Sequence, residues 1–105
     1  MGHSEPQIVS RMAQVVWLNE ALDQLDLIVA YLEAFDPDAA VRIAQRLVDL
    51  GESLKDFPRR GRLAADGTRE LVTVPPYILS YDVEGDIVSI VGIRHGARNL
   101  DSRLP

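Results

Sequence analysis

Two consecutive helical patterns, separated by Asp36-Pro37, constrain the fold of this chain more than any other feature of its sequence. Apolar residues recur every three or four positions over residues 20–35 and again over residues 40–54. This spacing gives each segment one apolar face. Asp36 is a preferred N-cap, and proline is tolerated at the first helical position. So short a connection predicts an antiparallel helical hairpin, in which Gly51 allows close contact with the first helix or the sheet.

The rest of the domain has strand patterns. These segments are residues 13–18, 69–74, 77–83 and 87–93. The first is an apolar run that predicts a strand buried on both faces, and Asn19 after it is a candidate helix N-cap. The third alternates, with its apolar face formed by Tyr77, Leu79, Tyr81 and Val83. The order strand, helix, helix, strand, strand, strand predicts an α+β fold, a two-layer domain with the helical hairpin packed on an antiparallel sheet.

Length and composition set the outer limits of the fold. The 105 residues suffice for one domain, expected over residues 13–99, between a flexible N-terminal segment of residues 1–12 and a tail of residues 100–105. The first four residues are compatible with a cloning remnant. The chain has no cysteine, which excludes disulfides and thiolate chemistry and suits a cytoplasmic location. No run approaches the roughly 18 apolar residues of a membrane span, so no membrane partner is expected.

The charge of the chain is unevenly distributed. The net charge is −5, which repels nucleic acid at long range. Residues 19–56 contain nine acidic and three basic residues, whereas residues 57–80 contain four arginines and two acidic residues. The helical half is therefore acidic and the middle segment is locally basic. Because nearly every cation is an arginine, fixed hydrogen bonding to carboxylate or phosphate is favoured.

Several short motifs, in this order and at this spacing, resemble the ParE/RelE toxin superfamily. They cover nearly the whole predicted domain, from Val15 to Arg98. The motifs are Val16-Trp17 before the first helix, Asp36-Pro37 with Ala39-Ala40, Pro58 to Gly61-Arg62, Arg69-Glu70-Leu71, Tyr77-Ile78-Leu79-Ser80-Tyr81 and Ile93-Arg94-His95-Gly96-Ala97-Arg98. Each motif alone is weak, and their combination is fairly specific.

The resemblance implies a toxin of a bacterial type II toxin–antitoxin pair that arrests growth. Its partner would be a ParD-like antitoxin, whose C-terminal segment wraps the toxin in a higher-order hetero-oligomer. Operator DNA would be contacted only through the antitoxin. No cofactor and no metal are implied, and a lone His95 cannot make a metal site.

The superfamily has two activities on one fold, and the fold cannot choose between them. RelE-like members cut mRNA on the ribosome, and ParE-like members block DNA gyrase. RelE-like sequences place an arginine after the first tyrosine of the Tyr77–Tyr81 motif, where this chain has Ile78. The missing cation and the acidic balance favour a ParE-like toxin that inhibits gyrase by protein binding. The alternatives are a ribosome-dependent mRNA endonuclease and a non-toxic relative that binds an antitoxin.

If the chain were a nuclease, His95 would be its best general base. Its catalytic group would then be His95, Arg62, Arg69 and Arg98. The alternative is that His95 hydrogen-bonds the terminal loop or lies at an interface. Arg98 could equally form a salt bridge with Glu70 or Asp82. The gyrase interpretation needs no catalytic residue.

Partner binding has its own candidates. The arginines would contact an acidic antitoxin tail or the target, because arginine is enriched at interface hot spots, or they balance the acidic helices. The apolar stripe of the first helix is core, or it is a groove for an amphipathic antitoxin helix. The partner-binding candidates are Arg59, Arg60, Arg62, Arg69, Leu22, Leu25, Val29, Leu32, Tyr77, His95 and Arg98. The aromatic residues expected in the core rather than in recognition are Trp17, Tyr31, Tyr77 and Tyr81.

Overall fold

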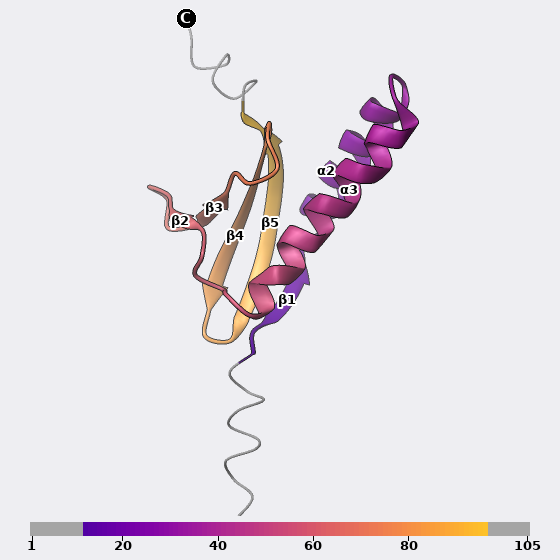
Figure 1. Cartoon of the computed structure of the whole chain (residues 1–105). Coiled ribbons are helices and arrows are strands. Elements are labelled where there is room, and N and C mark those ends of the chain that lie inside the picture. Colours follow the sequence, from indigo (N-terminus) through magenta and orange to yellow (C-terminus); the bar gives the residue numbers. More distant parts are fainter. Residues whose placement is uncertain (1–11, 97–105) are drawn as a thin grey trace, which may run out of the picture.

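The computed structural model describes residues 12–96 as two helices packed on a five-stranded sheet (Figure 1). The elements are β1 (Gln14–Trp17), α2 (Asn19–Glu33), α3 (Pro37–Glu52), the 3-10 turn η1 (Ser53–Lys55), β2 (Arg62–Leu63), β3 (Arg69–Leu71), β4 (Tyr77–Glu84) and β5 (Ile87–His95). The two-layer α+β architecture with a helical hairpin is confirmed. The predicted terminal segments and Arg98 lie largely or wholly outside the described residues.

The sheet is mixed, with the strand order β1-β5-β4-β3-β2. Strands β2 to β5 form the expected antiparallel meander, whereas β1 pairs parallel to β5, from Gln14 beside Ile87 to Trp17 beside Ile90. The expectation that residues 13–18 form a strand buried on both faces is wrong. As an edge strand, β1 has exposed residues alternating with half-buried ones. Its half-buried residues, Val15 and Trp17, pack against the core on the side of the helices.

The core lies between the hairpin and one face of β4 and β5. Tyr77, Leu79 and Tyr81 of β4 are each buried, as the alternation of their segment predicts. They join Leu47 and Leu50 of α3 in one apolar cluster. This face of the sheet is called the inner face below, and the opposite face is called the outer face. Because side chains alternate along a strand, each strand residue can be assigned to one of the two.

The four aromatic residues expected in the core divide between core and surface. Tyr77 and Tyr81 are buried, and Trp17 is half-buried with its indole N–H donating to Glu52 at 3.1 Å. Tyr31, by contrast, is 59% exposed. Tyr31 lies near the C-terminal end of α2, and this end of the hairpin projects away from the sheet (Figure 1).

The two helices begin differently. Asn19 is the first residue of α2, the preceding Leu18 occupies the N-cap position, and no side chain caps the helix. The prediction of Asn19 as the cap is therefore wrong. Asp36 does cap α3, because its Oδ1 accepts the Ala39 N–H at 3.2 Å, and Pro37 follows at the first helical position.

Replacing Asp36 by alanine is expected to lower the free energy of unfolding by about 1 kcal/mol, because the Ala39 N–H loses its acceptor. Urea denaturation monitored by circular dichroism measures this loss. Asp38→Ala is the matched control, since Asp38 lies in the same helical turn without forming the cap hydrogen bond. Equal losses in the two variants would show that charge near the helix end matters and the cap hydrogen bond does not.

Candidate functional site

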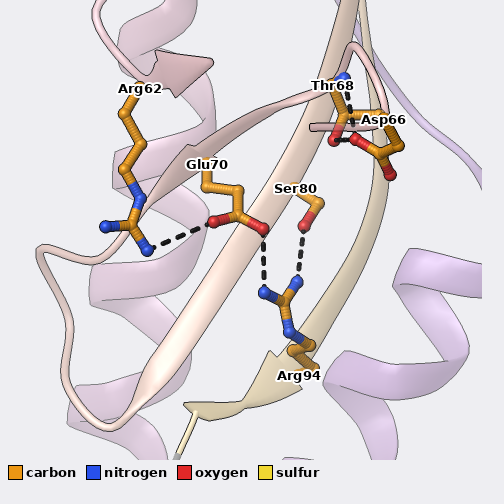
Figure 2. A network of polar contacts seen from close by, with 6 residues as sticks. All are labelled: Arg62, Asp66, Thr68, Glu70, Ser80 and Arg94. Carbon is orange, nitrogen blue, oxygen red and sulfur yellow. Dashed lines mark hydrogen bonds and ion pairs between the residues drawn. The ribbon is translucent and has the colours of Figure 1, made fainter. Parts of the chain in front are cut away.

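A row of polar residues crosses the outer face of the sheet. The strand register aligns Arg62 of β2 with Glu70 of β3, Glu70 with Ser80 of β4, and Ser80 with Gly92 of β5. Arg94 lies two residues beyond Gly92 on β5, and alternation places it on the same face. Segments far apart in the sequence therefore bring two guanidinium groups to one carboxylate (Figure 2).

Glu70 is the centre of this row. Its Oε2 accepts from Arg94 Nη2 at 2.8 Å, and its Oε1 accepts from Arg62 Nη2 at 3.3 Å. Arg94 Nη1 also donates to Ser80 Oγ at 3.1 Å. The Glu70 side chain is only 12% exposed. The Arg94 hydrogen bond lowers the pKa of Glu70, burial opposes that shift, and the charge of Arg94 and the contact with Arg62 reinforce it. Charge-assisted pairs of this kind are the stronger hydrogen bonds of a protein.

A hollow of about 220 Å³ lies beside this row. Its lining residues are Gln24, Asp66, Thr68, Glu70, Ser80, Val91, Gly92, Ile93 and Arg94. Asp66 sits in the loop before β3 and accepts from the Thr68 hydroxyl at 2.7 Å and from the Thr68 N–H at 3.0 Å (Figure 2). Both hydrogen bonds lower the pKa of Asp66, and the bond from the Thr68 hydroxyl has the larger effect. The hollow is therefore lined by charged groups of both signs.

Gln24 of α2 closes the hollow at the edge of the sheet. Strand β1 pairs with β5 only as far as Ile90, so the next stretch of β5 lacks a neighbouring strand on that side. The Gln24 Oε1 takes the place of one, because it accepts the Ile93 N–H at 2.6 Å. A β-carbon at position 92 would lie 2.9 Å from the same oxygen. The glycine therefore makes room for the side chain of Gln24.

The four arginines of the middle segment do not form one cluster. Arg69 lies on the inner face, where its Nη1 donates to the carbonyls of Gly61 at 2.8 Å and Arg59 at 3.2 Å. Arg60 turns toward η1 and donates to Ser53 Oγ at 2.9 Å. Arg62 joins Glu70 on the outer face. The side chain of Arg69 therefore holds the loop before β2 through two of its backbone carbonyl groups.

Tyr81 fixes the same loop from inside the core. Its hydroxyl oxygen accepts the Gly61 N–H at 2.8 Å, and its ring is fully buried. A β-carbon at position 61 would lie 2.7 Å from that hydroxyl and 2.9 Å from the Glu70 carbonyl oxygen. The glycine of the motif from Pro58 to Arg62 is thus required for packing.

His95 lies far from the arginines with which it was grouped. It sits opposite Tyr77 on the inner face, with the two rings edge to face at 5.6 Å. Arg62 is on the outer face, and Arg69 pairs with Tyr81, four residues further along β4. Four residues span about 13 Å of strand, and β3 and β5 are about 10 Å apart across β4. His95, Arg62 and Arg69 therefore do not converge on one point, and Arg98 lies outside the described residues.

The predicted apolar groove on the first helix is only partly open. Leu22 is 42% exposed, whereas Leu25, Val29 and Leu32 are half-buried. The most exposed apolar side chains of the hairpin are others, namely Leu27, Tyr31, Phe35 and Val41. Leu27, Tyr31 and Phe35 are spaced by four residues along α2 and the turn after it, and together they are called the distal stripe below.

Arg94 and Glu70 occur in two of the motifs, but the sequence alone indicates no site role for Arg94 and only Arg98 as a candidate partner for Glu70. The strand register shows that Arg94 lies directly opposite Ile78. A cation therefore stands beside the position where Ile78 replaces the expected arginine. Alternation contained a signal for this, since Ile78 and Ser80 share one face. The register shift between Ser80 and Tyr81, which brings Arg94 rather than Ile93 opposite Ile78, could not be read from the chain itself.

The sequence matches a known family of toxins. A family model described as the ParE toxin of the type II toxin–antitoxin system parDE matches residues 15–100. The chain belongs to this family.

Two proteins show what the chain is similar to. Toxin RelE2 of Caulobacter vibrioides is 52% identical over 87 residues, which cover 83% of this chain and 99% of the relative. Y4kP of Sinorhizobium fredii is 39% identical over 84 residues, which cover 78% of this chain and 86% of the relative. The first relative carries a RelE name although the family model carries a ParE name.

One solved structure has the same fold. It is described as the chromosomal ParDE system of P. aeruginosa, and it superposes with a TM-score of 0.71 at 22% identity, covering 81% of this chain and 97% of the other.

In the part of this chain that the structure describes, neither helix has the length and apolar character needed to cross a membrane.

Proposed function

We propose that this toxin arrests growth by binding DNA gyrase and is neutralised by a ParD-like antitoxin. The observation that carries this proposal is the separation of His95 from Arg62 and Arg69. RNA cleavage beside a 2′-hydroxyl needs a base, an acid and cations around a single phosphate. Arg62 lies on the opposite face of the sheet from His95, and Arg69 lies on the same face but four residues further along the strands. These groups therefore cannot act on one phosphate together, so binding a protein target fits the geometry better.

The electrostatics of the outer face support the same proposal. Glu70 neutralises part of the charge of Arg62 and Arg94, and Asp66 adds a second carboxylate beside them. An RNA phosphate would have to compete with a carboxylate that is already held by both guanidinium groups. Together with the acidic helices, this arrangement is a poor attractant for ribosomal RNA. The toxin would instead trap its protein target sterically or conformationally.

One observation favours mRNA cleavage as a second candidate function. Arg94 lies opposite Ile78 and beside Ser80 on the outer face, so it could supply the cation that the sequence lacks at position 78. The RelE name of the Caulobacter relative agrees with this candidate. It requires Arg94 to exchange Glu70 for phosphate.

A direct test incubates purified toxin with gyrase and relaxed plasmid, and in parallel with a translating extract. We expect supercoiling to be inhibited or cleaved DNA to accumulate, and mRNA to stay intact. Unimpaired supercoiling together with codon-specific mRNA cuts would contradict the proposal. In that case Arg94→Ala should reduce cleavage by about 100-fold or more, the usual cost of a lost transition-state contact, and exposed Arg42→Ala should not.

His95→Ala gives a second comparison. If the toxin acts by binding gyrase, the loss of an imidazole should weaken inhibition only as far as His95 contributes to the interface. If the unmodified toxin cut mRNA and left gyrase activity unchanged, and this variant did not cut mRNA, His95 would be the general base of a nuclease. Growth that is unaffected by expression without antitoxin would instead identify the chain as a non-toxic relative.

A further inference from the structure

We propose that the distal stripe, formed by Leu27, Tyr31 and Phe35, is a docking surface for a basic amphipathic helix of another protein. The proposal goes beyond the gyrase proposal and does not rest on it. It concerns the far end of the helical hairpin, away from the polar row on the outer face of the sheet.

The stripe is a continuous and exposed apolar surface. Leu27, Tyr31 and Phe35 are 69%, 59% and 73% exposed. A spacing of four residues puts successive side chains on the same side of a helix. The rings of Tyr31 and Phe35 are in contact, with centroids 5.1 Å apart. Single exposed apolar residues are ordinary, whereas three adjacent large ones indicate an interaction site.

The core of this domain leaves the stripe uncovered. Ala21, Leu25 and Ile28 of α2 face the core, and they lie on a different side of the helix from Leu27 and Tyr31. Gln24 reaches the edge of β5. Beyond this contact the hairpin projects away from the sheet (Figure 1), and the three side chains of the stripe stay exposed.

The charge around the stripe identifies the chemistry of its partner. Helix α2 contains four acidic residues and no basic one: Glu20, Asp23, Asp26 and Glu33. None of the three ion pairs formed within the described part of the chain uses any of these carboxylates. The stripe also lies toward the C-terminal end of α2, where the helix dipole is negative and the last turn has no basic residue. A partner with lysine or arginine beside its apolar residues would complement this field.

A second copy of the same chain fits less well. Two stripes packed on each other would bring both sets of α2 carboxylates together, and like charges across an interface oppose association. The span from Leu27 to Phe35 is about 12 Å, or roughly two helical turns. This length suits an amphipathic helix with apolar anchors three or four residues apart.

The proposal can be tested with two synthetic peptides and the full chain. One amphipathic helical peptide has leucines at three- and four-residue spacing flanked by lysines, and its twin has glutamates in place of the lysines. Fluorescence anisotropy measures affinity, and hydrogen exchange maps the contact. We expect the lysine peptide to bind and to slow hydrogen exchange at the end of α2. Its affinity should fall as salt is added, and the glutamate peptide should bind much more weakly.

Variants separate the stripe from general stickiness. Leu27→Ser and Phe35→Ser should each lower the affinity for the lysine peptide by about tenfold, the order of magnitude expected from one lost apolar anchor. Leu63→Ser is the matched control, because Leu63 is 67% exposed on β2, and it should leave binding unchanged. All three sites are at the surface, so the variants should keep the circular dichroism of the unmodified chain.

Four outcomes would overturn the proposal. Equal affinity for both peptides, or an equal loss in Leu63→Ser, would rule out a basic partner held by the stripe. Dimerisation in ultracentrifugation that Leu27→Ser abolishes would make a second copy the occupant. Peptide binding that appears only after removal of residues 97–105 would make that segment of this chain the occupant.

Discussion

Gly51→Ala is expected to lower the free energy of unfolding by about 1–3 kcal/mol, the usual cost of overfilling a packed core. Gly51 is buried near the end of α3. An added β-carbon would overlap the ring of Trp17 and lie 2.8 Å from Ile90 Cδ1. The loss should appear as a fall in melting temperature of about 4–8 °C for each kcal/mol. Thermal unfolding by circular dichroism measures it.

Helix propensity predicts the opposite sign for Gly51→Ala. Alanine is favoured over glycine in a helix by about 1 kcal/mol. A more stable variant would therefore show that the contact between α3 and Trp17 is looser than it appears. Trp17→Leu provides the internal control, because a smaller side chain leaves room for the new methyl group. In that background Gly51→Ala should cost less, and an equal cost would contradict the packing explanation.

The helical hairpin and the β4–β5 hairpin were predictable because their signals are local. The cap of α3 is a hydrogen bond between Asp36 and Ala39, which are three residues apart in sequence. The alternation from Tyr77 onward requires only the period of a strand, and the Gly85 turn has the positive φ that its sequence suggests. Each of these features is specified by neighbouring residues, so a single sequence contains it.

The place of β1 was not predictable in the same way. Its apolar run suggested a strand buried on both faces, yet it pairs only with β5, at an edge of the sheet. Which strand lies beside it depends on the path of the chain through both helices and three other strands. Strand β2, with only Arg62 and Leu63, is too short for any alternation to be recognised. Non-local pairing therefore decided the features that were missed.

The candidate site was missed for a related reason. Arg69 and Glu70 are adjacent in sequence but point to opposite faces, as do Arg94 and His95. A motif that groups such neighbours mixes two surfaces that have different partners. Pairing Arg94 with Glu70 requires the register of three strands. The sequence contained the residues of the polar row but not the assignment of each to a face.

Glu70→Gln is expected to lower the free energy of unfolding at neutral pH by about 1–3 kcal/mol, because both arginines lose a charged acceptor. The Glu70 carboxylate is nearly buried between Arg62 and Arg94. Removing it leaves two guanidinium groups on the outer face with like charge and weaker hydrogen bonds. Urea denaturation at neutral pH measures the loss. The guanidinium groups of Arg62 and Arg94 should at the same time become more available to an added anion.

The same variant should change the pH dependence of stability. Folding holds the pKa of Glu70 below its ordinary value of 4.5. A carboxyl group with a lowered pKa stabilises the fold fully above its unfolded pKa and loses that contribution as pH falls through the folded pKa. Stability should therefore decline below about pH 4.5, and Glu70→Gln should decline less steeply there. Identical slopes in the two proteins would show that Glu70 titrates alike in the folded and unfolded states.

A double-mutant cycle can then assign the stabilisation to one arginine. The Arg94 pair is shorter, at 2.8 Å against 3.3 Å, and Arg94 is 39% exposed against 67% for Arg62. Less solvent screening should make the coupling of Glu70 to Arg94 the larger of the two. If Arg62 couples as strongly, the polar row is a single network of three charges. If Arg94 dominates, Glu70 is the residue that keeps this cation, opposite Ile78, from binding phosphate.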